Sequence, residues 1–273
     1  MMISKRFTTK MSVTFAIGGM LLSTILLSGG AAYAKSSDKN CSQVPSHSDL
    51  KAALASAQSV SGGNGGFGLN MWGVVVNRDG FVCAVAFTGV DRHSQWPGSR
   101  VISAQKANTA NAFSLTGLSL STANLWAAVQ PGGSLYGLQH SNPVDTGEAY
   151  DGASSKFGQS NDPLVGGRMG GVNVFGGGLA LYNSSHVLVG AMGVSGDTSC
   201  ADHNIAWRTR HNLNMDFVPT GIPISGDATR PDNINYQGIA VIPSLANDFS
   251  HPICKIVGAD TVSAISAALP VTR

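Results

Sequence analysis

The sequence predicts an α+β domain, an antiparallel β-sheet flanked by helices, with a long inserted loop and a C-terminal extension. Two pairs of β-rich segments, each joined by a short polar turn, predict hairpins. Segments with apolar residues at helical spacing precede, separate and follow these hairpins. The order is helix, hairpin, helix, excursion, hairpin, helix, and we expect the helices to pack on one side of the sheet.

The first helix is followed directly by the first hairpin. Apolar side chains recur at helical spacing between positions 46 and 60, as in an amphipathic helix. A glycine-rich stretch at 61–68 ends this helix. The β-rich runs 71–76 and 81–87 then enclose an Asp-Gly turn at 77–80, which is a strong hairpin signal.

A second helix is predicted from Ser99 to Leu115. Its apolar residues keep to one side at a 3.6-residue period, and many of them are alanines, which permit close packing. From 117 to 168 the chain turns to Gly, Ser, Asn, Pro and Asp with little periodicity. The segment is interpreted as a long excursion, and long ordered loops in compact domains are often lids or binding loops.

The second hairpin comprises the β-rich runs 178–182 and 187–194, with a short polar turn at 183–186. A third helix follows. Ser199 and Asp202 stand three residues apart, a capping-box spacing with the shorter acid, and we expect the helix to begin there.

The residues after the third helix, 213–273, are rich in proline. Such a segment should wrap the surface of the domain before a short apolar helix near 262–269. The domain proper is then expected to span 35–212, with 117–168 as an insertion.

The first thirty-four residues predict a cleavable secretory signal peptide. Lys5, Arg6 and Lys10 precede an apolar stretch from 11 to 27, and Ala32-Tyr33-Ala34 fits the A-x-A cleavage rule. No basic stop-transfer cluster follows, and a lysine instead of a lipid-carrying cysteine comes after the cut. We therefore expect a periplasmic or secreted protein with no stable membrane anchor after cleavage.

The charge balance excludes two classes of partner. Removal of the signal takes away three of the 17 Lys and Arg and none of the 15 Asp and Glu, which leaves 14 against 15. With 12% charged residues and no basic excess, the mature chain lacks the electrostatic footprint of a protein that binds nucleic acid or anionic lipid. Its length suits one sizeable core.

All four cysteines lie in the part expected to be exported, where oxidation is favoured, so two disulfides are expected. Zinc binding is the other use of four cysteines, but no C-x-x-C pair is present. The proline-rich tail needs tethering, and Cys200, in the first turn of the third helix, is the nearest fixed cysteine to Cys254. We therefore expect Cys200 to join Cys254, and Cys41 to join Cys83.

Two glycine-rich segments resemble known motifs. Residues 63–68 match G-x-G-x-x-G but follow a helix and precede a strand, the reverse of a dinucleotide fingerprint, so we interpret them as a flexible linker.

Residues 193–197 resemble a nucleophile elbow with a displaced glycine. There, Ser195 and Gly196 form a strand-to-helix turn whose free N–H groups would suit an anionic ligand, or a tight turn that only packs the helix.

Histidine is the usual axial ligand of haem and a common ligand of other metals, and the chain has seven histidines. His93 is the best candidate, because it follows Arg92 in a loop at the end of a strand, a natural ligand-facing place. His203 on the third helix is the second candidate. His211 lies two turns further along the same helix, too far from His203 for both to bind one ion. Lys106 interrupts the alanine-rich face of the second helix, and its ammonium reaches either water or a carboxylate in a pocket.

Several of these segments together resemble the GlcG/HbpS haem-binding proteins, which are related to the C-terminal domain of PduO. The resemblance covers about residues 50–211 except the insertion. It is carried by the strand and turn 74–80, by Lys106-Ala107-Asn108-Thr109-Ala110, by Gly170-Gly171-Val172-Asn173, by 190–196 and by Asp202. Asn77 stands where the family usually has aspartate, Asn173 replaces the common proline, and the insertion and tail are longer than in the family.

The resemblance implies a small α+β domain that assembles as a homo-oligomer and binds haem or a small anionic ligand. We expect an exported protein for haem capture, buffering or sensing. Candidate ligand-binding residues are His93, Arg92, Lys106, Ser195, Gly196 and His203, with His93 on the iron. Two alternatives stay open: an extracytoplasmic enzyme or accessory protein acting on a small carboxylated metabolite, with Lys106 and Asp91 in its pocket, and a partner subunit of a membrane sensor.

Overall fold

We analysed a computed structural model of the chain, which describes residues 40–219, 221–236 and 248–273. These residues belong to one compact unit, 35–273. The expected signal peptide lies outside the described residues. Among those that are described, no helix has the length and apolar character needed to cross a membrane.

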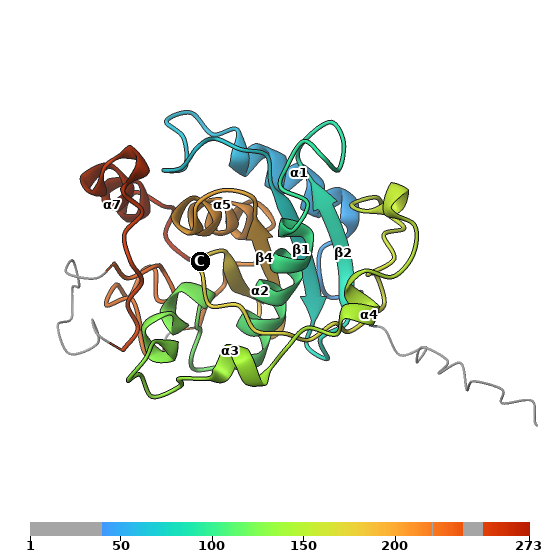
Figure 1. The fold of residues 1–273 in the computed structure, drawn as a ribbon. Helices are drawn as coiled ribbons and strands as arrows, with labels where there is room; N and C mark the ends of the chain where they lie inside the picture. Colours follow the sequence, from blue (N-terminus) through green and yellow to red (C-terminus); the bar gives the residue numbers. More distant parts are fainter. Residues whose placement is uncertain (1–39, 220, 237–247) are drawn as a thin grey trace, which may run out of the picture. The chain divides into compact units, whose positions relative to one another are not determined.

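A four-stranded antiparallel sheet forms the centre of the domain, in the strand order β2-β1-β4-β3 (Figure 1). Its strands are β1 (Trp72–Asn77), β2 (Val82–Phe87), β3 (Gly178–Tyr182) and β4 (Leu188–Ser195). Both predicted hairpins are therefore present, and the α+β class is confirmed. The two hairpins join through the long pairing of β1 with β4.

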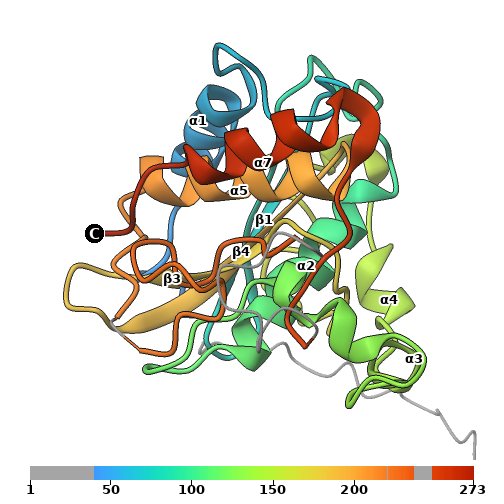
Figure 2. The same ribbon diagram turned by 90° about the vertical axis from the view of Figure 1, so that its left-hand side faces the viewer.

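Helices cover both faces of the sheet, so the expectation that they pack on one side is wrong. On one face, α2 (Ser99–Phe113) packs its alanines against Val74 and Val76. On the other, α1 (His47–Gln58) and α5 (Ser199–Asn212) pack against Val75 and the alternate side chains of β4 (Figures 1 and 2). Since both faces are buried, the strands carry nearly continuous apolar runs instead of an alternating pattern.

The third predicted helix begins at the expected residue but is capped by another one. Thr198 is the N-cap of α5, and its side chain accepts a hydrogen bond from the backbone N–H of Ala201. The predicted capping box of Ser199 and Asp202 is therefore wrong, because the Asp202 carboxylate turns toward Lys106 instead.

The insertion contains only short helices: η1 (Thr122–Leu125), η2 (Ala127–Val129), α3 (Leu138–Ser141), α4 (Thr146–Ala149) and η3 (Ser154–Lys156). The tail carries η4 (Lys255–Val257) and α7 (Ala259–Ala267), and α7 lies beside α5 (Figure 2). Both expected disulfides are present: Cys41–Cys83 fixes the segment before α1 to β2, and Cys200–Cys254 fixes the tail to the start of α5.

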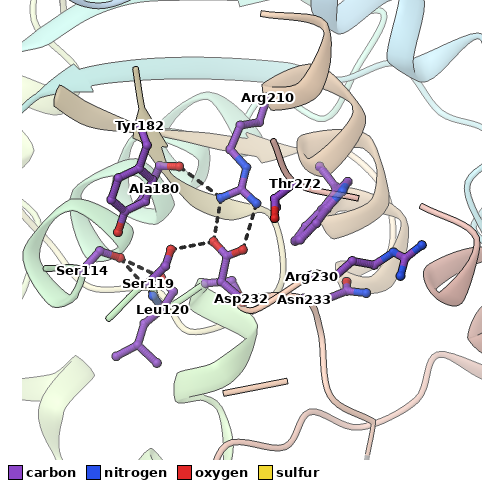
Figure 3. Close-up of polar contacts among 12 residues, drawn as sticks. Ser114, Ser119, Leu120, Ala180, Tyr182, Arg210, Arg230, Asp232, Asn233 and Thr272 are labelled. Carbon is purple, nitrogen blue, oxygen red and sulfur yellow. Dashed lines mark hydrogen bonds and ion pairs between the residues drawn. The ribbon is translucent and has the colours of Figure 1, made fainter. Parts of the chain in front are cut away.

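A buried ion pair joins the tail, the insertion and α5 (Figure 3). The Arg210 guanidinium on α5 donates to both carboxylate oxygens of Asp232 in the tail, at 2.6 and 2.8 Å, and both side chains are fully buried. Asp232 also accepts from the hydroxyl of Ser119 in the insertion at 2.8 Å, and Arg210 donates to the Ala180 carbonyl on β3 at 3.1 Å. Elements far apart in sequence thus meet at one bidentate contact.

Candidate functional site

Two cavities flank the start of α2. The first, called here the His93 cavity, has a volume of about 370 Å³ and is lined by Trp72, Arg92, His93, Pro97, Gly98, Arg100, Val101, Tyr150, Ser154 and Phe157. The second, the Lys106 cavity, has a volume of about 340 Å³ and is lined by Trp96, Ser99, Ile102, Lys106, Asn173, Phe175, Ser195, Asp197, Ser199 and Asp202. The structure therefore divides the predicted ligand-binding residues between two sites, with Arg92 and His93 in one and Lys106 and Ser195 in the other.

The His93 cavity combines an available imidazole with an apolar wall. His93 is exposed, and within the described residues its ring makes no hydrogen bond. Its backbone N–H donates to the Asp91 carboxylate at 2.9 Å, a contact that lowers the pKa of Asp91 and holds the loop. Asp91 itself lines neither cavity, so its expected place beside Lys106 is wrong.

The insertion supplies the outer wall of the His93 cavity. Arg100 near the start of α2 is buried and forms an ion pair with Asp162, with Nε donating at 2.9 Å, and its guanidinium also lies 3.6 Å from the ring centre of Phe157. Tyr150 and Phe157 thereby come to lie beside Trp72 of β1 around one cavity. The indole N–H of Trp72 is buried there, and no described residue accepts a hydrogen bond from it.

The Lys106 cavity has a polar floor made by a buried ion pair. The Lys106 ammonium is only 2% exposed and donates to Asp202 at 2.7 Å and to the Val194 carbonyl at 3.1 Å. Burial raises the pKa of Asp202 to about 6, against the lowering effect of Lys106. The sequence left two interpretations of Lys106, an ammonium in water or an ammonium facing a carboxylate in a pocket. The first is wrong, and the carboxylate that the ammonium faces is the protein's own Asp202.

The turn after β4 is not a free anion site. The backbone N–H groups of Gly196 and Asp197 both donate to Oδ1 of Asp202, at 3.1 and 2.9 Å. The protein's own carboxylate thus occupies the place proposed for a ligand at Gly196. Ser195 does line the cavity, where its hydroxyl lies 3.3 Å from the Ser99 hydroxyl.

The glycine-rich segment before β1 is fixed rather than a flexible linker. The carboxylate of Asp197 accepts hydrogen bonds from the backbone N–H groups of Phe67 and Leu69, at 2.8 and 3.0 Å. Gly66 packs so tightly against Asp197 and Ala201 that a Cβ would collide with both. The segment opens no helix, in agreement with our rejection of a dinucleotide fingerprint.

His203 lies in the core and lines neither cavity. Its ring is fully buried, and Nε2 lies 3.0 Å from both the backbone nitrogen of Ile234 and Oδ1 of Asn233. Because the tail covers this face of α5, the structure leaves His203 no access to a ligand, which corrects its place among the candidates.

Two buried histidines should make stability depend on pH. Burial lowers the pKa of His203 to about 3 and that of His251 to about 4, from 6.5. The unfolded chain takes up these protons near pH 6.5 and the folded chain does not, so the free energy of unfolding falls as pH drops toward 4, by about 1.4 kcal/mol per pH unit for each histidine. The raised pKa of Asp202 acts in the opposite direction below pH 6, so about one histidine's contribution remains.

Urea unfolding between pH 7 and 4.5 checks this expectation. His203→Gln keeps an amide near the position of Nε2 and should reduce the slope by about 1.4 kcal/mol per pH unit. His140→Gln, at an exposed position, should leave it unchanged. Equal slopes in the wild type and His203→Gln would contradict the assignment.

Sequence reasoning did not identify Trp72, Tyr150, Phe157 and Asp162 as parts of a site. Trp72 was only one residue of the predicted β-rich run 71–76. The other three lie in the insertion, whose lack of periodicity gives no signal for the side chains that face α2. No group of three or more His, Cys, Asp or Glu suited to a metal ion occurs in the described parts of the chain.

Comparisons with known proteins identify the family. The family model described as "Haem degrading protein HbpS-like" matches residues 47–210, more than half of the chain. The structure is similar to the crystal structure of a PduOC:heme complex, with 21% identity and a TM-score of 0.43, over 63% of this chain and 94% of that one. It is also similar to the crystal structure of the Klebsiella pneumoniae protein ORFY, family-model DUF336, with 23% identity and a TM-score of 0.41, over 61% and 87% of the two chains. No curated protein matches the sequence. The family model covers both β-hairpins and the helices on both faces of the sheet, and the chain belongs to the HbpS-like family of haem degrading proteins.

Proposed function

We propose that the protein is an exported haem-binding protein that captures, buffers or senses haem through the His93 cavity. The observation that carries the proposal is the place of His93, whose ring has no hydrogen bond to a described residue and lines a cavity beside Arg92 and three aromatic side chains. Membership of a family described by haem degradation supports haem as the ligand.

The residues of the His93 cavity fit haem. An imidazole suits the iron, the rings of Trp72, Tyr150 and Phe157 suit the apolar macrocycle, and Arg92 suits a propionate. Arg100 is already paired with Asp162, so its role is to hold the wall in place. When bound, haem would supply the iron and its redox chemistry, while the protein would provide the ligand, the apolar contact and the charge.

A haemin titration followed by visible spectroscopy tests this function. The wild type should give a saturable Soret band, and His93→Ala should shift that band and weaken binding about tenfold or more. His140→Ala removes another exposed histidine outside the cavity and should leave both unchanged. A flat titration of the wild type would refute haem binding, whereas an unchanged His93→Ala spectrum would refute only the assignment of the ligand.

Export and assembly form part of the same proposal. The expected signal peptide and the two disulfides support a periplasmic or secreted location. The low charged fraction and the many small residues support a homo-oligomer. Light scattering should give a multiple of the chain mass, and a monomer mass across micromolar concentrations would contradict this.

A further inference from the structure

We propose that the Lys106 cavity is a second binding site, independent of haem, for a small carboxylic acid with an apolar or aromatic body. Its volume of about 340 Å³ lies within the range of small-molecule pockets. It shares no lining residue with the His93 cavity, although the Asp91–Gly98 loop contributes to both.

The acidic side chains of the cavity already have their hydrogen-bond partners. Asp197 accepts from three backbone N–H groups, those of Phe67, Leu69 and Thr198, at 2.8, 3.0 and 2.6 Å. Asp202 accepts from two backbone N–H groups and from the Lys106 ammonium. The charge of Asp202 is compensated by Lys106, and Asp197, which keeps its charge, is stabilised by three backbone donors, so neither carboxylate lacks hydrogen-bond donors.

In contrast, several hydrogen-bond donors at this cavity have no acceptor among the described residues. The Lys106 ammonium has three N–H groups and makes two hydrogen bonds in the described structure. The residues Ser99 and Ser195 are 2% and 5% exposed, and their hydroxyls share one hydrogen bond, so one hydroxyl proton has no acceptor among the described residues. The side-chain amide nitrogen of Asn173, Nδ2, also has no acceptor among the described residues. A ligand that brings acceptor oxygens, and a carboxylate above all, satisfies this surplus.

The start of one long helix, α2, reinforces the preference for negative charge. Ser99 is the first residue of α2 and Ser199 the first residue of α5, and both line the cavity. The positive end of the α2 dipole therefore lies at the same cavity as the buried ammonium, whereas the N–H groups before α5 already donate to Asp202.

The rim of the cavity is apolar. Trp96 and Phe175 are 52% and 45% exposed, large fractions for aromatic side chains, and Ile102 lies with them. A ligand whose carboxylate meets the polar floor would cover these side chains with its body. This combination of an apolar rim and a few convergent polar groups is typical of a binding site for a small organic molecule.

Calorimetric titration of the haem-free protein with benzoate, benzamide and benzylamine tests the proposal. Benzoate should bind saturably, benzamide at least tenfold more weakly, and benzylamine not measurably. Ser195→Ala and Trp96→Ala should each weaken benzoate binding about tenfold. Ser154→Ala, which removes a serine from the other cavity, and His93→Ala should leave it unchanged.

The outcomes separate this site from the haem site. Benzylamine that binds as tightly as benzoate, or benzoate binding unchanged in both Ser195→Ala and Trp96→Ala, would overturn the proposal. Loss of benzoate binding in His93→Ala would overturn the independence of the two cavities. Haemin titrations of Ser195→Ala and Trp96→Ala should match the wild type. If benzoate does not bind as expected, the proposal for the Lys106 cavity fails, and haem binding is still decided by the haemin titration alone.

Discussion

Replacement of Asp232 by alanine should lower the free energy of unfolding by about 3–5 kcal/mol. The substitution leaves the fully buried Arg210 guanidinium without its bidentate partner, and Ser119 without its acceptor. Because Arg210 lies on α5 beneath the tail, the uncompensated charge should also loosen the tail and the start of the insertion. Urea unfolding followed by circular dichroism measures the loss, and limited proteolysis shows whether the tail is released.

Asp227→Ala provides a matched control. Asp227 also belongs to the tail and also pairs with an arginine, Arg230, at 2.8 Å, but both side chains are partly exposed. Exposed pairs contribute at most about 1 kcal/mol, so this variant should stay close to the wild type. Equal losses in Asp227→Ala and Asp232→Ala would show that burial of the Arg210 pair is not what fixes the tail.

Removal of the Cys200–Cys254 disulfide, by replacement of both cysteines with alanine, should cost about 4 kcal/mol on the chain-entropy model. The bond closes a loop with a sequence separation of 54 and holds the segment before α7 against α5. Differential scanning calorimetry of the double variant measures the loss, and proteolysis should cut the tail before the domain. Replacement of Cys41 and Cys83 with alanine removes a bond with a sequence separation of 42 and should lower the free energy of unfolding by nearly as much. The tail should then stay resistant to proteolysis. Preferential cleavage of the tail in both double variants would reject this division of roles.

Local patterns in the sequence were sufficient for most elements of the fold. The Asp-Gly turn at 77–80 and the alanine periodicity of α2 located the first hairpin and the helix that follows it. The sequence analysis did not predict that helices cover both faces of the sheet. The run Val74-Val75-Val76 carries the signal for it, because a strand buried on both faces shows a continuous apolar run instead of alternation. The Thr198 cap was missed because a serine in the next position gives the same local pattern.

The candidate sites were only partly predictable. His93 and Lys106 were singled out by type and local context and each lines a cavity, but nothing local shows that the two cavities are different ones. The roles of Asp162 and Asp232 depend on pairing with Arg100 and Arg210 over long sequence distances, and such pairing leaves no periodic trace. A single sequence therefore indicates which residue types can bind a ligand, and the tertiary contacts decide which of them remain available.

The two disulfides join cysteines that are consecutive along the chain, Cys41 with Cys83 and Cys200 with Cys254. A chain that crosses a membrane from its N-terminus presents the first pair well before the second. An oxidant that joins thiols in their order of appearance would then make both native bonds directly, with no need for an isomerase to exchange wrong partners. If the chain is exported as proposed, oxidative maturation should need only an oxidase, and the tail should be secured last.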